Sequence, residues 1–143
     1  MSLGFLSHTV IFPVSVRYMA DHDYDVNDGI DDGDVYAVSD GLTGGVPHPG
    51  DFYSFVPICI DGEIVAWAVG INHLMENGAP VAGSWATFSV DTFMDGLVCP
   101  PMRTGRNLKQ ESWWRAIWER RTRAATMNIL DDWYGRPGRR WRR

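Results

Sequence analysis

The sequence predicts an α+β fold, with an antiparallel, hairpin-based sheet, a short N-terminal helix and one long C-terminal helix. Two apolar segments, 52–60 and 63–71, are joined by Asp61-Gly62, a dipeptide that favours the positive φ angles of a type I′ hairpin turn. Apolar residues recur at helical spacing near each end of the chain. The 143 residues match the length of one domain.

The first predicted element is a short helix at 13–23. Pro13 suits a first helical position, and the apolar side chains that follow fall on one side of a helix. The next stretch, 23–34, consists largely of aspartate and glycine, so we expect the chain to cross the surface there. Its aspartates resemble a calcium loop only loosely, because no glutamate closes the twelve-residue pattern.

Strands are predicted at 34–40, 52–60 and 63–71. The later stretch 75–107 is rich in Gly, Pro, Asn, Ser and Thr, and only 86–90 and 94–99 suggest short strands within it. A long irregular segment in a compact domain is often functional or rests on a partner.

One long helix is predicted at 107–130. Asn107 and Gln110 fit a capping box at its start, and tryptophan, isoleucine and alanine recur along one side. A tryptophan stripe of this kind favours core packing over a ligand platform. Glycine, proline and arginine dominate the end of the chain, so we expect a domain at 1–132 and a basic, disordered tail at 133–143.

Charge and composition argue against several classes of partner. The formal net charge of −5 combines an aspartate-rich stretch with an arginine-rich end, where tryptophans among the arginines favour a protein contact over nucleic acid. No apolar run approaches the roughly 18 residues that cross a bilayer, and the N-terminus lacks a signal-peptide pattern, which predicts a cytoplasmic protein without membrane contact. The spacing of Cys59 and Cys99 does not suit metal ligands, so we expect both to be reduced thiols.

Four polar residues fall at the ends of the predicted strands. Asp40 ends the first strand, His48 and Asp51 flank the start of the second, and His73 ends the third. The Asp61-Gly62 turn pairs residues whose numbers sum to about 123 or 124, which places Asp51 opposite His73. Carboxylates and imidazoles at one hairpin mouth indicate a metal or acid–base site, and the alternative is that they satisfy backbone groups of a tight loop.

Other polar features of the sequence carry weaker indications. The segment GLTGG could cradle phosphate, but it lacks the lysine and the following helix of a nucleotide loop, so a plain turn is favoured. Ser39 and Ser84 have no adjacent histidine and predict structural hydroxyls. Tyr53 could donate a hydrogen bond near the site, or be an ordinary half-buried strand tyrosine.

The segment GDVYAVSDGLTGGVPHPGDFYSFVPICIDGEIVAWAVGINH resembles a known family stretch. There a strand ends in Asn-Asp-Pro, a Gly-Gly-x-His-x-x-Asp loop follows, and a hairpin ends in histidine. The family is the hydantoinase B/5-oxoprolinase group, with greatest similarity to the large subunits of acetone and acetophenone carboxylases. Further similar segments are SHTVIFPVSVRYMADHDYDVNDGIDDGD, GSWATFSVDTFMDGLVCPPMRTG and RAATMNILDD, so the resemblance spans 7–132.

This resemblance implies a reaction and partners. The family subunit works with an ATP-binding hydantoinase A-like partner. Its ketone carboxylases activate substrate and bicarbonate by phosphorylation, join an enolate to carbon dioxide and use a small third subunit. In acetone carboxylases the large subunit holds manganese through aspartate and histidine. The implied function is thus part of an ATP-dependent ketone carboxylase that binds the ketone or enolate, with ATP used by a partner subunit.

The resemblance also implies roles for individual residues. Asp40 matches the aspartate of Asn-Asp-Pro, His48 and Asp51 match the loop histidine and aspartate, and His73 matches the later histidine. These four residues would hold a divalent metal, namely manganese, iron or zinc. His48, Asp51 and Tyr53 would be the catalytic residues.

Three departures from the family pattern bear on the metal. Pro47 is an extra residue in the loop, and Gly41 replaces the proline after the aspartate. Tyr53 stands where acetone carboxylases place a further histidine, which allows a metal-free site like that of an acetophenone-type relative. Upstream, His8 matches a motif histidine.

Two alternative functions stay open at this point. A hydantoinase or 5-oxoprolinase type of cyclic amide hydrolase would have almost the same loop. The chain could instead be a non-catalytic assembly subunit or an inactive fragment, since family members run to several hundred residues and the resemblance covers an interior piece.

Overall fold

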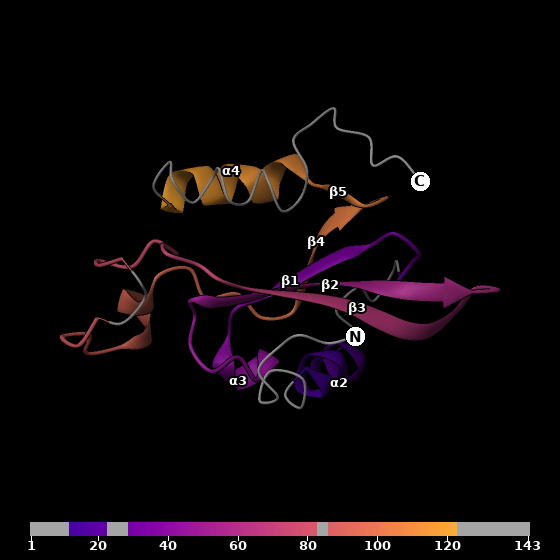
Figure 1. The fold of residues 1–143 in the computed structure, drawn as a ribbon, viewed down its shortest axis with the longest axis horizontal. Coiled ribbons are helices and arrows are strands. Elements are labelled where there is room, and N and C mark those ends of the chain that lie inside the picture. Colours follow the sequence, from indigo (N-terminus) through magenta and orange to yellow (C-terminus); the bar gives the residue numbers. More distant parts are fainter. Residues whose placement is uncertain (1–11, 23–28, 83–85, 123–143) are drawn as a thin grey trace.

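The computed structural model describes residues 12–22, 29–82 and 86–122. Its elements are α2 (Pro13–His22), β1 (Val35–Val38), α3 (Gly41–Gly44), β2 (Asp51–Ile60), β3 (Glu63–His73), the 3₁₀ helix η1 (Thr92–Asp95), β4 (Met102–Arg106), β5 (Lys109–Gln110) and α4 (Ser112–Arg121). The strands form one antiparallel sheet in the order β3-β2-β1-β4-β5. Helix α4 lies over one face of the sheet, and α2 and α3 lie against the other (Figure 1). The predicted α+β class is therefore confirmed.

The hairpin of β2 and β3 forms as the sequence predicted. Asp61 and Gly62 have φ angles of 52° and 84°, which are the positive values that a type I′ turn requires. Asp51 pairs with His73 across the hairpin, and the register shifts once, between Ile58 and Cys59. The numbers of paired residues add up to 124 before this shift and to 123 after it, which confirms the expected pairing.

Strand β2 separates two apolar cores because successive side chains of a strand point to opposite faces. Phe52 packs under α4 with Trp114 and Trp118, and both indoles are buried, so the core interpretation of these tryptophans is confirmed. On the other face, Tyr53 and Phe55 pack with buried residues that include Met19 of α2. Both faces of β2 are thus fixed by aromatic packing.

The short strands expected at 86–90 and 94–99 are wrong. Part of this region forms η1 instead, and the side chain of Asp91 caps it by accepting a hydrogen bond from the N–H of Phe93 at 3.0 Å. Near its end, the carbonyl oxygen of Cys99 accepts hydrogen bonds from the N–H groups of Ser39 and Asp40. The segment is held by such individual hydrogen bonds and joins no ladder of the sheet.

The long C-terminal helix is wrong in its first part. Asn107 and Leu108 have φ angles of 53° and 57° and form the turn between β4 and β5, so Asn107 cannot cap a helix and Gln110 lies in a strand. Helix α4 starts at Ser112 after Glu111, whose side chain makes no capping hydrogen bond. The predicted helix is also too long, because α4 ends at Arg121 and the next residue, Thr122, is extended. Residues 123–130 of the predicted helix and the tail at 133–143 lie outside the described residues. No helix in the described ranges is long and apolar enough to span a membrane.

Cys99 is expected to be almost inert to thiol reagents in the folded chain. Burial, and secondarily the charge of Asp40, raise the pKa of its thiol to about 11 from 9.0, against a lowering by a hydrogen bond with Ser39. At pH 8 its thiolate fraction is then about 100-fold below that of an ordinary thiol. With an aromatic disulfide reagent we expect the partly exposed Cys59 to react first, and Cys99 to react only as urea unfolds the chain.

The raised pKa of Cys99 also links stability to pH. Because the folded chain favours the neutral thiol, this contribution to stability is fully present below pH 9 and is lost as the pH rises through about 11. Equal reaction rates for Cys59 and Cys99 in the native protein would show that Cys99 is not buried as described.

Candidate functional site

Asp40 follows β1 and serves as the N-cap of α3. Its carboxylate accepts hydrogen bonds from the N–H groups of Leu42 and Thr43 at 3.1 and 3.2 Å, and also from the hydroxyl of Thr43. Side-chain oxygens at this position satisfy the first free N–H groups of a helix. Asp40 is not one of the residues whose ligand atoms converge nearby. The first four residues of the GLTGG segment form α3 and Gly45 ends it, so the structure has a short helix where the sequence predicted a plain turn.

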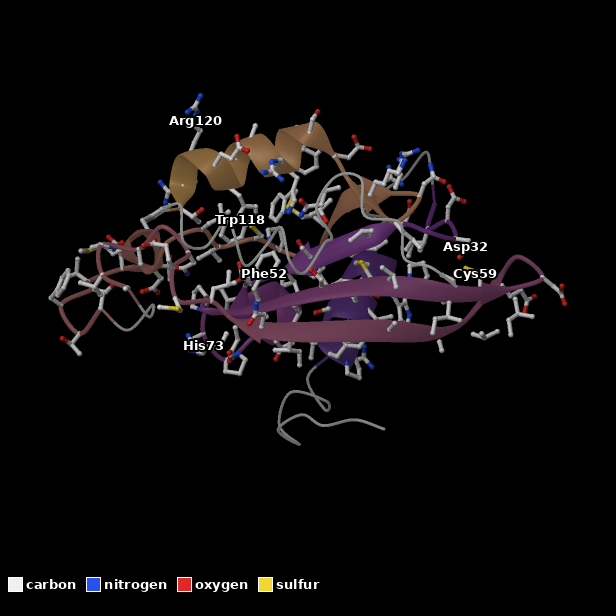
Figure 2. All side chains as sticks on the ribbon, turned by 45° about the horizontal axis from the view of Figure 1, so that its top comes forward. Asp32, Phe52, Cys59, His73, Trp118 and Arg120 are labelled. Atoms are coloured by element: carbon white, nitrogen blue, oxygen red, sulfur yellow. The ribbon has the colours of Figure 1, made fainter. Side chains whose placement is uncertain are left out.

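His48, Asp51 and His73 converge at the mouth of the hairpin. Strand pairing places Asp51 directly opposite His73, and the loop before β2 brings His48 over both. The rings of His48 and His73 have centroids 4.9 Å apart, and Nε2 of His48 lies 3.4 Å from Oδ2 of Asp51. His73 points outward at the end of β3 (Figure 2). Three of the four predicted ligands are thus brought together.

The loop backbone orients the His48 ring. Nδ1 of His48 accepts a hydrogen bond from the N–H of Gly50 at 3.3 Å, so the ring proton of the neutral form belongs on Nε2, toward Asp51. The N–H of Asp51 donates to the carbonyl of His48 at 2.9 Å, which closes the loop on itself. A cation bound at Nε2 would displace this proton and weaken the contact with Gly50.

The donor set of the cluster fits a divalent metal. One ligand atom from each of His48, Asp51 and His73 lies within 4.8 Å of the others. An ion with bonds of about 2.1 Å holds tetrahedral ligand atoms about 3.4 Å apart, so the three side chains would have to move toward one another to bind it. Two imidazoles and one carboxylate that leave further positions open are typical of iron(II), and each donor type also suits manganese or zinc.

Tyr53 lies two residues after Asp51 and on the same face of β2. The residue is fully buried in the core beneath α2, where its neighbours include Tyr36 and Phe55. Burial, and then the negative charge of Asp51, raise the pKa of the Tyr53 hydroxyl to about 12. Its hydroxyl therefore stays protonated at neutral pH, which suits hydrogen-bond donation and not general-base catalysis.

Two buried polar residues next to the site were not singled out from the sequence. Glu76 and Asn77 follow the end of β3 and are 6% and 1% exposed. Glu76 accepts a hydrogen bond from the N–H of Gly78, and Asn77 donates to the carbonyl of Asp95 at 2.8 Å. They fix the loop after His73. The signal in the sequence that could have identified them is the Glu-Asn pair directly before Gly78. The predicted residues His8 and Ser84 lie outside the described part of the chain.

Comparison with known proteins gives consistent similarities. A family model described as hydantoinase B/oxoprolinase matches residues 4–133. The acetone carboxylase alpha subunit of Xanthobacter autotrophicus is 31% identical over 131 residues, which cover 92% of this chain and 17% of that protein. The acetophenone carboxylase delta subunit of Aromatoleum aromaticum is 34% identical over 108 residues, which cover 76% of this chain and 15% of that one.

Solved structures show the same fold. A nucleotide-free structure of acetone carboxylase, from work on ATP-dependent acetone carboxylation, aligns with a TM-score of 0.82 and 30% identity over 93% of this chain and 17% of that one. An ATP-dependent caprolactamase from Pseudomonas jessenii aligns with a TM-score of 0.64 and 21% identity over 86% and 24%, a likeness of fold alone. The chain spans about one sixth of the curated relatives.

Proposed function

Because this chain belongs to the hydantoinase B/oxoprolinase family, we propose that it contributes the ketone- or enolate-binding site of an ATP-dependent carboxylase like acetone and acetophenone carboxylases. The observation that carries the proposal is the convergence of His48, Asp51 and His73 at the hairpin mouth. The remaining machinery of such an enzyme, including ATP binding, would lie on other polypeptide segments.

His48, Asp51 and His73 would hold a divalent cation, whose positive charge stabilises negative oxygen such as that of an enolate when it is bound. Asp51 supplies the negative charge of the cluster, and its burial strengthens its attraction to a cation. His73 is exposed and faces a substrate that approaches from solvent. The hydroxyl of Tyr53 would stay protonated and uncharged, and it would help to orient this end of β2.

The proposed reaction needs partner chains. An ATP-binding subunit of the hydantoinase A type would phosphorylate the ketone and bicarbonate, and a small third subunit could complete the assembly. The names of both curated relatives describe subunits, which supports a role in a complex. Ring-amide hydrolysis is the alternative within the family, since the family description includes oxoprolinase.

Manganese titration followed by ketone relaxation measurements tests the proposal. We expect one Mn²⁺ per chain by calorimetry, and faster proton relaxation of acetone or acetophenone in the Mn²⁺-loaded protein than in the same protein loaded with Zn²⁺. Faster relaxation of hydantoin or 5-oxoproline instead of the ketones would favour the amide alternative. Absence of Mn²⁺, Fe²⁺ and Zn²⁺ binding would refute the metal site.

A further inference from the structure

The three residues of the cluster at the hairpin mouth are not held equally. The side chains of His48 and Asp51 are only 15% and 10% exposed, and Nε2 of His48 lies 3.4 Å from Oδ2 of Asp51. Two tetrahedral ligand atoms of an ion with bonds of about 2.1 Å are about 3.4 Å apart as well. The ligand atoms of all three residues lie within 4.8 Å of one another, so the wider distances of the cluster are those to His73. The buried pair is therefore at binding distance already, and His73 is not.

The loop before β2 makes the His48–Asp51 pair rigid. Prolines stand directly before and after His48, and each fixes a φ angle of the loop. The N–H of Gly50 donates to Nδ1 of His48, and the N–H of Asp51 donates to the carbonyl of His48. The N–H of Leu74 donates to the carbonyl of Gly50 at 2.7 Å, and the side chain of Leu74 is fully buried in the core under α4. The loop is thus tied both to itself and to the core.

The side chain of His73 is held more loosely. Gly50 and Leu74 are joined by a hydrogen bond, and such pairs alternate along an antiparallel ladder, so Asp51 and His73 form a non-hydrogen-bonded pair. The imidazole of His73 is exposed and points outward (Figure 2). Among the described residues it contacts the ring of His48, at 4.9 Å between centroids, and makes no side-chain hydrogen bond. Exposed side chains change rotamer freely, so this ring can turn toward the pair while the backbone stays in the ladder.

We propose that His48 and Asp51 form a preorganised half-site for a divalent cation, and that His73 is a movable third ligand that turns onto the ion after the pair has bound it. The half-site rests on the metal binding proposed for this cluster and adds an order of engagement to it. The order follows from the geometry. The rigid pair loses little conformational freedom on binding, whereas His73 must give up the rotamers of an exposed side chain.

The two imidazoles should therefore contribute unequally to affinity. Without His48 the preorganised pair is lost, and an ion of any kind is held by one carboxylate and one loosely held imidazole. Without His73 the pair is intact, and water can take the third position. Mn²⁺ suits carboxylate and water oxygens, whereas Zn²⁺ also suits imidazole nitrogen. The loss of His73 should consequently matter more for Zn²⁺ than for Mn²⁺.

Calorimetric titration of the purified chain with Mn²⁺ and with Zn²⁺ tests this inequality. We expect His48→Ala to weaken the binding of both ions by at least about 100-fold. His73→Ala should weaken Mn²⁺ binding by less than about tenfold and Zn²⁺ binding by more than about 30-fold. His22→Ala is the matched control, because His22 is an exposed histidine of α2 outside the cluster, and this variant should bind both ions as wild type does.

Nuclear magnetic resonance relaxation of the ¹³C-labelled imidazole rings gives a readout that does not involve affinity. In the metal-free chain we expect a rigid ring for His48 and a ring that moves on the picosecond-to-nanosecond timescale for His73. Saturation with Zn²⁺ should make the His73 ring as rigid as that of His48. The ring of His22 should be unaffected by the ion.

The outcomes separate a failure of the half-site from a failure of the metal site. Equal losses of affinity in His48→Ala and His73→Ala, for both ions, would show one preformed set of ligands and overturn the inference, while the metal site would stand. A His73 ring that is as rigid as that of His48 before the ion is added would overturn it too. No binding of either ion to wild type would remove the metal site and the half-site together. Circular dichroism checks the fold of each variant, and His48→Gln replaces His48→Ala if the alanine variant unfolds.

Discussion

Asp51→Ala is expected to lower the affinity of the chain for Mn²⁺ or Zn²⁺ by at least about 100-fold. Asp51 supplies the only carboxylate of the converging cluster in the described residues, and it is 7% exposed, so its negative charge is poorly replaced by solvent. The two imidazoles would remain, but neutral ligands alone hold a divalent cation less tightly. Calorimetric titration of wild type and variant at pH 7.5 measures the change.

Asp40→Ala is the informative control because Asp40 is the fourth metal ligand predicted from the sequence. The structure places its carboxylate on the N–H groups of α3, so we expect this variant to lose about 1 kcal/mol of stability while its metal affinity stays unchanged. Equal losses of affinity in the two variants would restore the four-ligand hypothesis. An Asp51→Ala variant that binds as wild type would remove the cluster as a metal site.

The hairpin and the facing of Asp51 and His73 could be predicted from the sequence because both follow from local chemistry. Asp61-Gly62 fixes the turn, and the turn fixes which residues pair over the whole length of two strands. The one register shift changes the sum of the paired residue numbers from 124 to 123 near the turn, and the pairing at the mouth of the hairpin stays as predicted. The position of His48 near Asp51 could also be predicted, because the loop between the two residues is short.

The position of Asp40 could not be predicted in the same way. An aspartate at the end of a strand before GLTGG suits both an N-cap and a metal ligand, and the choice depends on how four following residues coil. Sequence similarity to a family motif does not decide it, since Gly41 replaces the proline of that motif. The hydrogen bonds to Leu42 and Thr43 show the capping role.

The turn between β4 and β5 was missed for a different reason. Asparagine tolerates positive φ, but leucine rarely does, so Asn107-Leu108 gives no turn signal in the sequence. The tertiary contact decides it: the N–H of Leu108 donates to the carbonyl of Gly33 at 2.7 Å, far away in the chain. Helical periodicity starting at Trp113 was real, and extending it back to Asn107 was the error.

Trp118→Ala is expected to destabilise the chain by about 3–5 kcal/mol, the largest effect on folding that we predict. Trp118 is 1% exposed in the core under α4, with its ring centroid 5.2 Å from that of Phe52 and 5.8 Å from that of Trp114. Removing the indole leaves a cavity that the sheet and helix cannot close. Urea unfolding monitored by circular dichroism measures the loss.

Two other substitutions on α4 separate packing from the other consequences of losing Trp118. Trp113→Ala should cost below about 1 kcal/mol, because Trp113 is 42% exposed. Trp118→Phe should cost much less than Trp118→Ala, since the buried indole Nε1 has no hydrogen-bond partner among the described residues and phenylalanine removes that donor while retaining an aromatic ring. Similar losses for Trp113→Ala and Trp118→Ala would contradict the described packing.

Because Phe52 directly follows Asp51, a Trp118→Ala variant that still folds should also bind metal more weakly, which would link the core under α4 to the geometry of the hairpin mouth.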